Sequence, residues 1–229
     1  MIDDKIVIAT TPNYWQKTKL TVGIVKPNST SQISEKKYVE LVKEAISMWN
    51  NAFYEYSKKI SHEHLREIQL KVSENLKGDE DVLVQWWHSD RGNGRTFFEQ
   101  DKGKIKKSSI FIAKYFGPHI SSFTDDGDTS SLIIHTSDEI RSIALHELGH
   151  VLGLGHCNYK RDLMAASTTA TIDTDRRISS LDMDVISQLF KGYFEKNSTV
   201  MITHMISKSK WVPIKLSTHP KTDHFVNYS

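Results

Sequence analysis

The chain has 229 residues, of which 38% are hydrophobic, and its formal net charge is +2. This length predicts one domain with a tail or two small domains, and the composition is that of a globular protein with a substantial core. The weak charge argues against a nucleic-acid partner, and no apolar run approaches the ~20 residues of a membrane-spanning helix.

The opening stretch, MIDDKIVIATTP, carries acids where a secretion signal carries bases. The chain as written therefore has no signal peptide, so we expect a cytoplasmic protein, or an extracellular one if the sequence is a trimmed mature form. The single cysteine, Cys157, excludes an internal disulfide and leaves packing and metal binding to hold the fold. We expect a monomer.

The first half of the chain predicts a strand, a long helix and further strands. Residues 19–25 are rich in β-branched side chains, which favour a strand. From a capping Ser34 onward, apolar residues recur every three or four positions, which predicts a long amphipathic helix over residues 34–60. Further strands are expected at residues 65–72, 81–87 and 108–116, with a loop at 88–104 that contains a short strand at 96–99, and a polar connection at 117–131.

The stretch HTSDEIRSIALHELGH, residues 135–150, predicts a second helix. Thr136 and Glu139 have the spacing of a capping box. His146 and His150 lie away from the apolar side of this helix and face a cleft. That apolar side consists of Ile140, Ala144, Leu148 and Val151. Residues 179–194 predict a third helix, and the order of elements is typical of an α+β or α/β layered fold.

Two of the histidines in HELGHVLGLGH, residues 146–156, suit one metal ion. Residues four apart on a helix stack about 6 Å apart along its axis, so the imidazoles of His146 and His150 can reach one point. Glu147 lies close enough to act on a metal-activated water without being a ligand. Hydrolytic zinc sites usually take three protein ligands and keep a fourth position open, so a third ligand is expected.

The glycines of the same stretch explain how that third ligand arrives. Glycine adopts positive φ at little cost, so Gly153, with Gly155, permits the chain to reverse sharply after the helix. The reversal brings His156 back to the same ion. The sequence therefore predicts one zinc ion held by three imidazoles. The alternative to a metal site is that His-Glu-x-x-His occurs by chance on a polar helix surface, and the longer pattern argues against it.

The stretch HELGHVLGLGH resembles the zinc-binding signature of the metzincin metallopeptidases, and its surroundings resemble the matrixin branch, in particular an interstitial-collagenase-type catalytic domain without its propeptide. WQKTKLTVGI, AISMWNN and ISSLDMDVISQLF are similar to the entry strand, the first helix and the last helix of that family. Met164, separated from His156 by seven residues, matches the methionine of the family's Met-turn, which forms a hydrophobic floor beneath the metal. The chain continues with AAS instead of Tyr-Pro, so substrate preference does not carry over.

The resemblance implies an α+β, zincin-like fold. A twisted mixed sheet, an N-terminal amphipathic helix, an active-site helix and a C-terminal helix would surround a zinc cleft. Residues 1–193 would form the catalytic domain, with an upper subdomain to about residue 153 and a lower one over 154–193. Residues 194–229 have no counterpart in the resemblance, and we expect an extension there that forms a β-hairpin, with a disordered tail as the competing reading.

The function implied is that of a zinc-dependent endopeptidase. Its partner would be a peptide or protein substrate, and Glu147 would act as general base on the attacking water. Two other readings stay open: a catalytically silent, zinc-stabilised binding protein of the same fold, and a zinc amidase that acts on a non-peptide amide.

Two further metal sites are also expected. Matrixins often hold a second zinc ion through scattered histidines and aspartates, and an acidic loop has the oxygens that calcium prefers. Structural histidines and a solvated acidic turn are the competing readings. The candidates for the second zinc are His88, Asp90, His119 and His135, and those for calcium are Asp125, Asp126 and Asp128.

Overall fold

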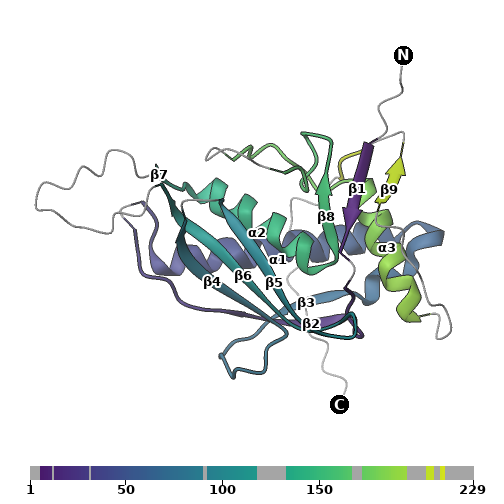
Figure 1. The fold of residues 1–229 in the computed structure, drawn as a ribbon, viewed down its shortest axis with the longest axis horizontal. Coiled ribbons are helices and arrows are strands. Elements are labelled where there is room, and N and C mark those ends of the chain that lie inside the picture. Colours follow the sequence, from purple (N-terminus) through teal and green to yellow (C-terminus); the bar gives the residue numbers. More distant parts are fainter. Residues whose placement is uncertain are drawn as a thin grey trace, which may run out of the picture.

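A twisted mixed sheet carries the long helices, as Figure 1 shows for the computed structural model. The structure describes residues 6–11, 13–30, 32–89, 92–117, 133–166, 172–194, 205–208 and 212–214. The strand order is β3-β2-β4-β6-β5, with β7 paired to β6. Strands β3, β2, β4 and β6 run parallel, while β5 and β7 are antiparallel to β6. The strands are β2 (Lys19–Ile24), β3 (Gln69–Val72), β4 (Val82–Ser89), β5 (Gly94–Asp101), β6 (Lys104–Phe116) and β7 (Ile133–Ile134). The α+β fold expected from the sequence is confirmed.

Helix α1 (Glu35–Ser57) forms where the apolar periodicity predicts it, and the Ser34 hydroxyl caps it by accepting a hydrogen bond from the Lys37 N–H. Its buried face includes Trp49, which is fully covered. The Trp49 Nε1–H donates to the carbonyl of Leu145 at 2.9 Å. This hydrogen bond ties α1 to the helix that carries the candidate site.

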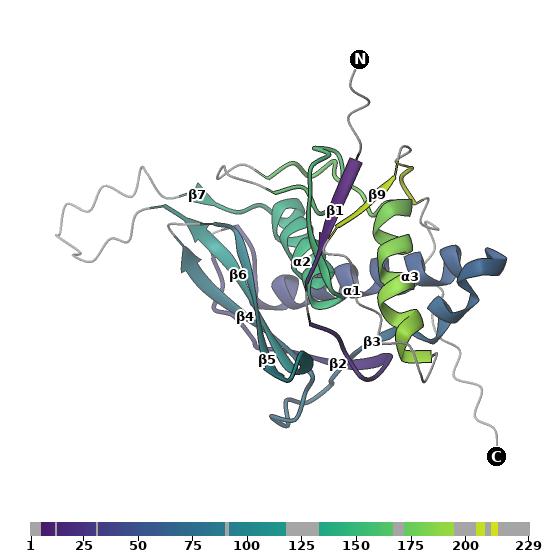
Figure 2. The same cartoon turned by 45° about the vertical axis from the view of Figure 1, so that its right-hand side comes forward.

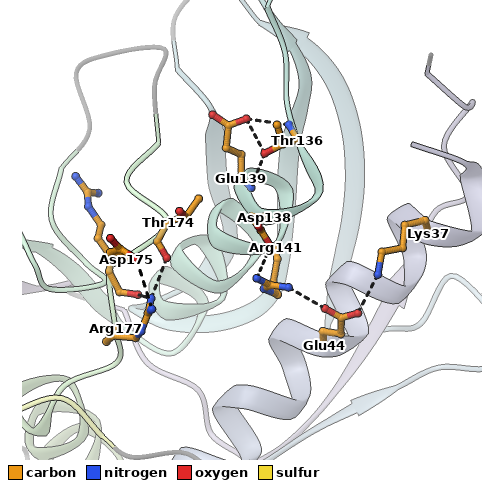
Figure 3. Close-up of polar contacts among 10 residues, drawn as sticks. Lys37, Glu44, Thr136, Asp138, Glu139, Arg141, Thr174, Asp175 and Arg177 are labelled. Carbon is orange, nitrogen blue, oxygen red and sulfur yellow. Dashed lines mark hydrogen bonds and ion pairs between the residues drawn. The ribbon is translucent and has the colours of Figure 1, made fainter. Parts of the chain in front are cut away.

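Helix α2 (Ser137–Val151) begins with the predicted capping box. The Glu139 N–H donates to the Thr136 hydroxyl, and the Thr136 N–H donates to the Glu139 carboxylate, as Figure 3 shows. On the solvent side, Arg141 pairs with Glu44 of α1 at 3.3 Å. Both side chains are partly exposed, so this ion pair adds little to stability.

The region between α1 and β3 departs from the sequence prediction. Residues 60–67 form a 3-10 helix, η1 (Ile60–Glu67), and only Gln69–Val72 is a strand. Leu65 and Ile68, three positions apart, are both buried. The expectation of a strand over 65–72 was therefore wrong for its first half. The loop expected at 88–104 is shorter than predicted, because β4 runs to Ser89, and the short strand expected at 96–99 is part of a longer one, β5 (Gly94–Asp101).

A second, three-stranded sheet lies beside helix α3 (Ser180–Phe194), as both views show (Figures 1 and 2). Its central strand is β1 (Ile6–Thr10), which pairs antiparallel with β8 (Leu154–Cys157) and with β9 (Met205–Lys208). The sequence reading contained no strand at residues 6–10. Strand β1 therefore lies between β8, which follows α2, and β9, which comes from the last part of the chain.

The predicted C-terminal hairpin falls only partly within the described residues. Strand β9 pairs with β1, while residues 212–214 run beside the start of α3, where the Ser180 N–H donates to the Val212 carbonyl at 2.7 Å. The division of the chain at residue 193 stays a prediction. Within the described residues, no helix combines the length and apolar character needed to cross a membrane.

Candidate metal centre

The second half of α2 faces a cleft of about 510 Å³. Strand β5 forms one wall, and β8 together with the segments around Leu163 and Arg176 forms the other. His146, Glu147 and His150 all line this cleft, as the helical spacing predicts. The opposite side of α2 is buried in the core, where Ile140 and Leu148 are fully covered.

The third histidine reaches the cleft because the chain reverses after α2. Gly153 adopts a φ of 97°, a left-handed conformation that glycine accepts without strain, and its N–H donates to the His150 carbonyl at 2.9 Å. Strand β8 then carries His156 to the other two rings. One possible ligand atom from each of the three histidines lies within 4.8 Å of the others. Gly155 does not turn the chain: it lies inside β8, opposite Ala9.

The donor set fits zinc in its hydrogen bonding as well as its spacing. The Nδ1 atoms of His146 and His150 each lie 2.8 Å from a backbone carbonyl, of Leu163 and Leu154 respectively. A carbonyl only accepts, so each Nδ1 carries the proton and each Nε2 keeps a lone pair for a metal. Three neutral imidazoles with one open position are a common hydrolytic zinc site.

Burial favours the same neutral state of these rings. It lowers the pKa of His146 to about 3 and that of His150 to about 4, with the neighbouring imidazoles as a smaller cause. Burial, followed by the positive charge of Arg176, also lowers the pKa of His156. Because a metal ion binds the unprotonated ring, the site is ready to bind zinc at neutral pH.

Glu147 lies beside these rings and is only 4% exposed. Its Oε2 accepts a hydrogen bond of 2.6 Å from the hydroxyl of Thr96 on β5. Burial raises its pKa to about 7, while the Thr96 hydrogen bond and the charge of Arg95 act in the opposite direction. A carboxyl group with such a pKa can both take up and release a proton near neutral pH. A cation in the site would favour its ionised form.

Met164, the expected Met-turn residue, lies in the core beside α2, and its role beneath a metal stays a prediction. Its side chain is fully buried and packs against the backbone of α2 at Gly149. The Met164 N–H donates to Asp162 at 2.8 Å. Asp182 of α3 is also fully buried, and burial followed by the nearby Asp162 carboxylate raises its pKa well above the usual range.

The weaker metal sites remain predictions. Among the described residues, His146, His150 and His156 are the only group of three or more His, Cys, Asp or Glu side chains with metal-binding spacing. His88 lies on β4 and His135, fully buried, lies between β7 and α2. The other candidates, Asp90, His119, Asp125, Asp126 and Asp128, lie outside the described residues.

Sequence reasoning missed the contribution of β5 and β1 to the cleft. Gly94, Thr96 and Phe98 of β5 and Thr11 after β1 all line it. These residues carry no motif. The alternation of half-buried and exposed residues along the first part of β5 is visible only in the structure.

Known proteins show similarity to this chain at the family level. The matrixin family model matches residues 14–191. Matrix metalloproteinase-16 of Homo sapiens is 24% identical over 157 residues, and metalloendoproteinase 2-MMP of Arabidopsis thaliana is 26% identical over 171 residues. Each alignment covers 69% of this chain, but only 24% and 40% of those relatives, so the chain spans less than half of their length. A solved structure, the GM1 bound form of the ECX AB5 holotoxin, aligns over 82% of this chain and 88% of its own with a TM-score of 0.46 and 15% identity.

Proposed function

Because the chain belongs to the matrixin family, whose members are zinc metallopeptidases, we propose that it is a zinc-dependent endopeptidase. His146, His150 and His156 hold the ion, and Glu147 is the general base. The convergence of three neutral imidazoles in a cleft beside a buried carboxyl group is the observation that carries this proposal. Zinc bound there supplies a Lewis acid that polarises the scissile carbonyl and acidifies a water molecule.

Glu147 moves the proton in this scheme. It takes the proton that the attacking water loses as the new carbon–oxygen bond forms. It then delivers that proton to the nitrogen of the leaving amine as the carbon–nitrogen bond breaks. Its burial beside the cleft keeps competing water away from the carboxylate.

The free edge of β5 supports a peptide as substrate. In the described part of the chain β5 pairs only with β6, so its other edge presents unpaired backbone groups along the cleft. An extended peptide can pair with such an edge and lie across the histidines. A small non-peptide amide would use none of these groups, which favours the endopeptidase over an amidase.

A library of mixed peptides tests the proposal. We expect the wild-type protein to cut internal peptide bonds, and a chelator or Glu147→Gln to abolish cleavage, with products read by mass spectrometry. Glu147→Gln keeps the shape of the side chain and should still bind zinc. Cleavage that survives the chelator would remove zinc from the mechanism, and cleavage by Glu147→Gln would remove Glu147. A wild-type protein that binds zinc but cuts no peptide would favour the alternative of a catalytically silent binding protein.

Zinc binding is tested separately from cleavage. A ligand at one hundred times its dissociation constant raises the free energy of unfolding by about 2.7 kcal/mol. We expect zinc to raise the melting temperature of the metal-free protein by about 5–11 °C. His156→Ala should reduce this shift, while His64→Ala, a half-buried histidine that contacts α3 outside the cleft, should leave it unchanged.

A further inference from the structure

We infer that Thr96 is a positioning residue for Glu147: its hydroxyl holds Oε2 of the carboxylate and thereby presents Oε1 to the cleft. This inference rests on the proposed function, since it matters for catalysis only if Glu147 transfers the proton. Thr96 belongs to no motif, and it lies far from Glu147 in the sequence, on a different element.

The contact itself is short and directed at the carboxylate. The Thr96 Oγ1 lies 2.6 Å from Glu147 Oε2 and 3.3 Å from the Glu147 carbonyl oxygen. A hydroxyl has one proton, and the shorter distance to a charged acceptor assigns that proton to the carboxylate. Among the described residues, Thr96 is the only hydrogen-bond donor to the Glu147 side chain.

The donor is fixed by the sheet. Thr96 pairs with Ile110 of β6, and the ladder between β5 and β6 extends from Gly94 to Asp101. Ile110 is 1% exposed, so this part of the ladder is anchored in the core. The hydroxyl therefore occupies a place set by the sheet, while Glu147 projects from α2 and depends on a partner to choose one side-chain rotamer.

Gly94 provides the space for the second oxygen. A Cβ at this position would lie 2.7 Å from Cγ and 2.8 Å from Cδ of Glu147, and nearer still to Oε1. The carboxylate thus rests directly over the Gly94 backbone, where both residues line the cleft. Thr96 holds one oxygen, and the absence of a side chain at Gly94 leaves room for the other.

The Thr96 hydroxyl should therefore affect the rate of the chemical step. Without the hydroxyl, the carboxylate can rotate away from the direction in which it must accept the proton. Misplacement of a catalytic group by about 1 Å can cost on the order of a hundredfold in rate. Because Thr96 acts on Glu147 and not on the substrate, we expect the loss in kcat and little change in KM.

The experiment compares Thr96→Val, which removes the hydroxyl but keeps the shape, with Thr96→Ser, which keeps the hydroxyl. Thr21→Val is the matched control, because Thr21 is also a strand threonine whose hydroxyl lies 3.1 Å from a carboxylate, that of Asp81, but outside the cleft. We expect Thr96→Val to lower kcat tenfold or more, with KM and zinc content within twofold of wild type. Thr96→Ser should recover kcat to within threefold, and Thr21→Val should leave it unchanged.

A second readout does not depend on activity. Crystal structures of the metal-free variants should show the Glu147 carboxylate displaced in Thr96→Val and in place in Thr96→Ser. The inference is overturned if Thr96→Val keeps kcat within twofold, if Thr96→Ser is equally impaired, or if the carboxylate does not move. Thr96→Ala replaces the valine variant should that one fail to fold. A wild-type protein that cuts no peptide refutes the proposed function instead, and the crystal structures still decide the contact.

Discussion

Replacing Gly94 with alanine should separate activity from stability. The added Cβ would lie 2.8 Å from the carboxyl carbon of Glu147. Carbon atoms pack at about 3.5 Å, so the carboxyl group has to retreat by about 0.7 Å. That shift also strains its hydrogen bond to Thr96, at 2.6 Å. Since misplacement by about 1 Å can cost a hundredfold, we expect kcat/KM to fall about ten- to a hundredfold.

The fold should tolerate the same change. Gly94 does not have a positive φ, so alanine fits the backbone, and the atoms that must move are the end of a side chain beside a cleft. Gly→Ala replacements at compatible positions stabilise by about 0.4–1 kcal/mol, because the unfolded chain loses freedom. The melting temperature should therefore stay within about 4 °C of wild type or rise.

The assay measures kcat/KM on a peptide that the wild-type protein cleaves, together with thermal unfolding and bound zinc. A Gly94→Ala protein that is fully folded, zinc-loaded and active to within threefold of wild type would refute the placement of Glu147 over Gly94. A protein that loses activity and zinc together would show that the damage reaches the metal site. Neither result is expected.

Three other changes probe the surroundings. Gly149→Ala would place a Cβ 3.1 Å from Met164 Cε and nearer still to its sulfur in a closed core, so we expect a loss of about 1–3 kcal/mol in the free energy of unfolding, measured with denaturant. Gly155→Ala would place a Cβ 2.8 Å from that of Ala9, forcing β1 and β8 apart, and zinc affinity measured by chelator competition should fall. The pKa of Asp182 is raised, so the native state holds its proton more tightly than the unfolded chain and stability falls as pH rises above about 4. Asp182→Asn should therefore gain stability relative to wild type as pH increases over that range, and parallel unfolding curves would contradict this reasoning.

Local signals predicted the helices well. The period of α1 and the capping box of α2 are properties of short stretches, and the structure confirms both together with Ser34 as a cap. The three histidines could be assigned to one metal site because their spacing is also a local property of the sequence. Two of them are one helical turn apart, and Gly153 has the positive φ that the sequence reading required.

Nonlocal pairing explains most of what the sequence did not reveal. Strand β1 has a short apolar run, and its partner β9 lies almost at the other end of the chain. Strand β5 is an edge strand with one half-buried face, so its apolar alternation is weak. Thr96 becomes a partner of Glu147 only when β5 is placed beside α2, and no local pattern records that placement.

The strand that carries the third histidine pairs with a segment that the matrixin match does not include. His146 and His150 are fixed by one rigid helix, within residues 14–191. His156 lies on β8, a short strand whose pairing partner in the described structure is β1, and β1 in turn pairs with β9. Residues 6–10 and 205–208 both lie outside the match. Two ligands are therefore placed by local geometry, while the strand that carries the third also depends on its pairing with β1, so changes in β1 should weaken zinc binding without altering α2.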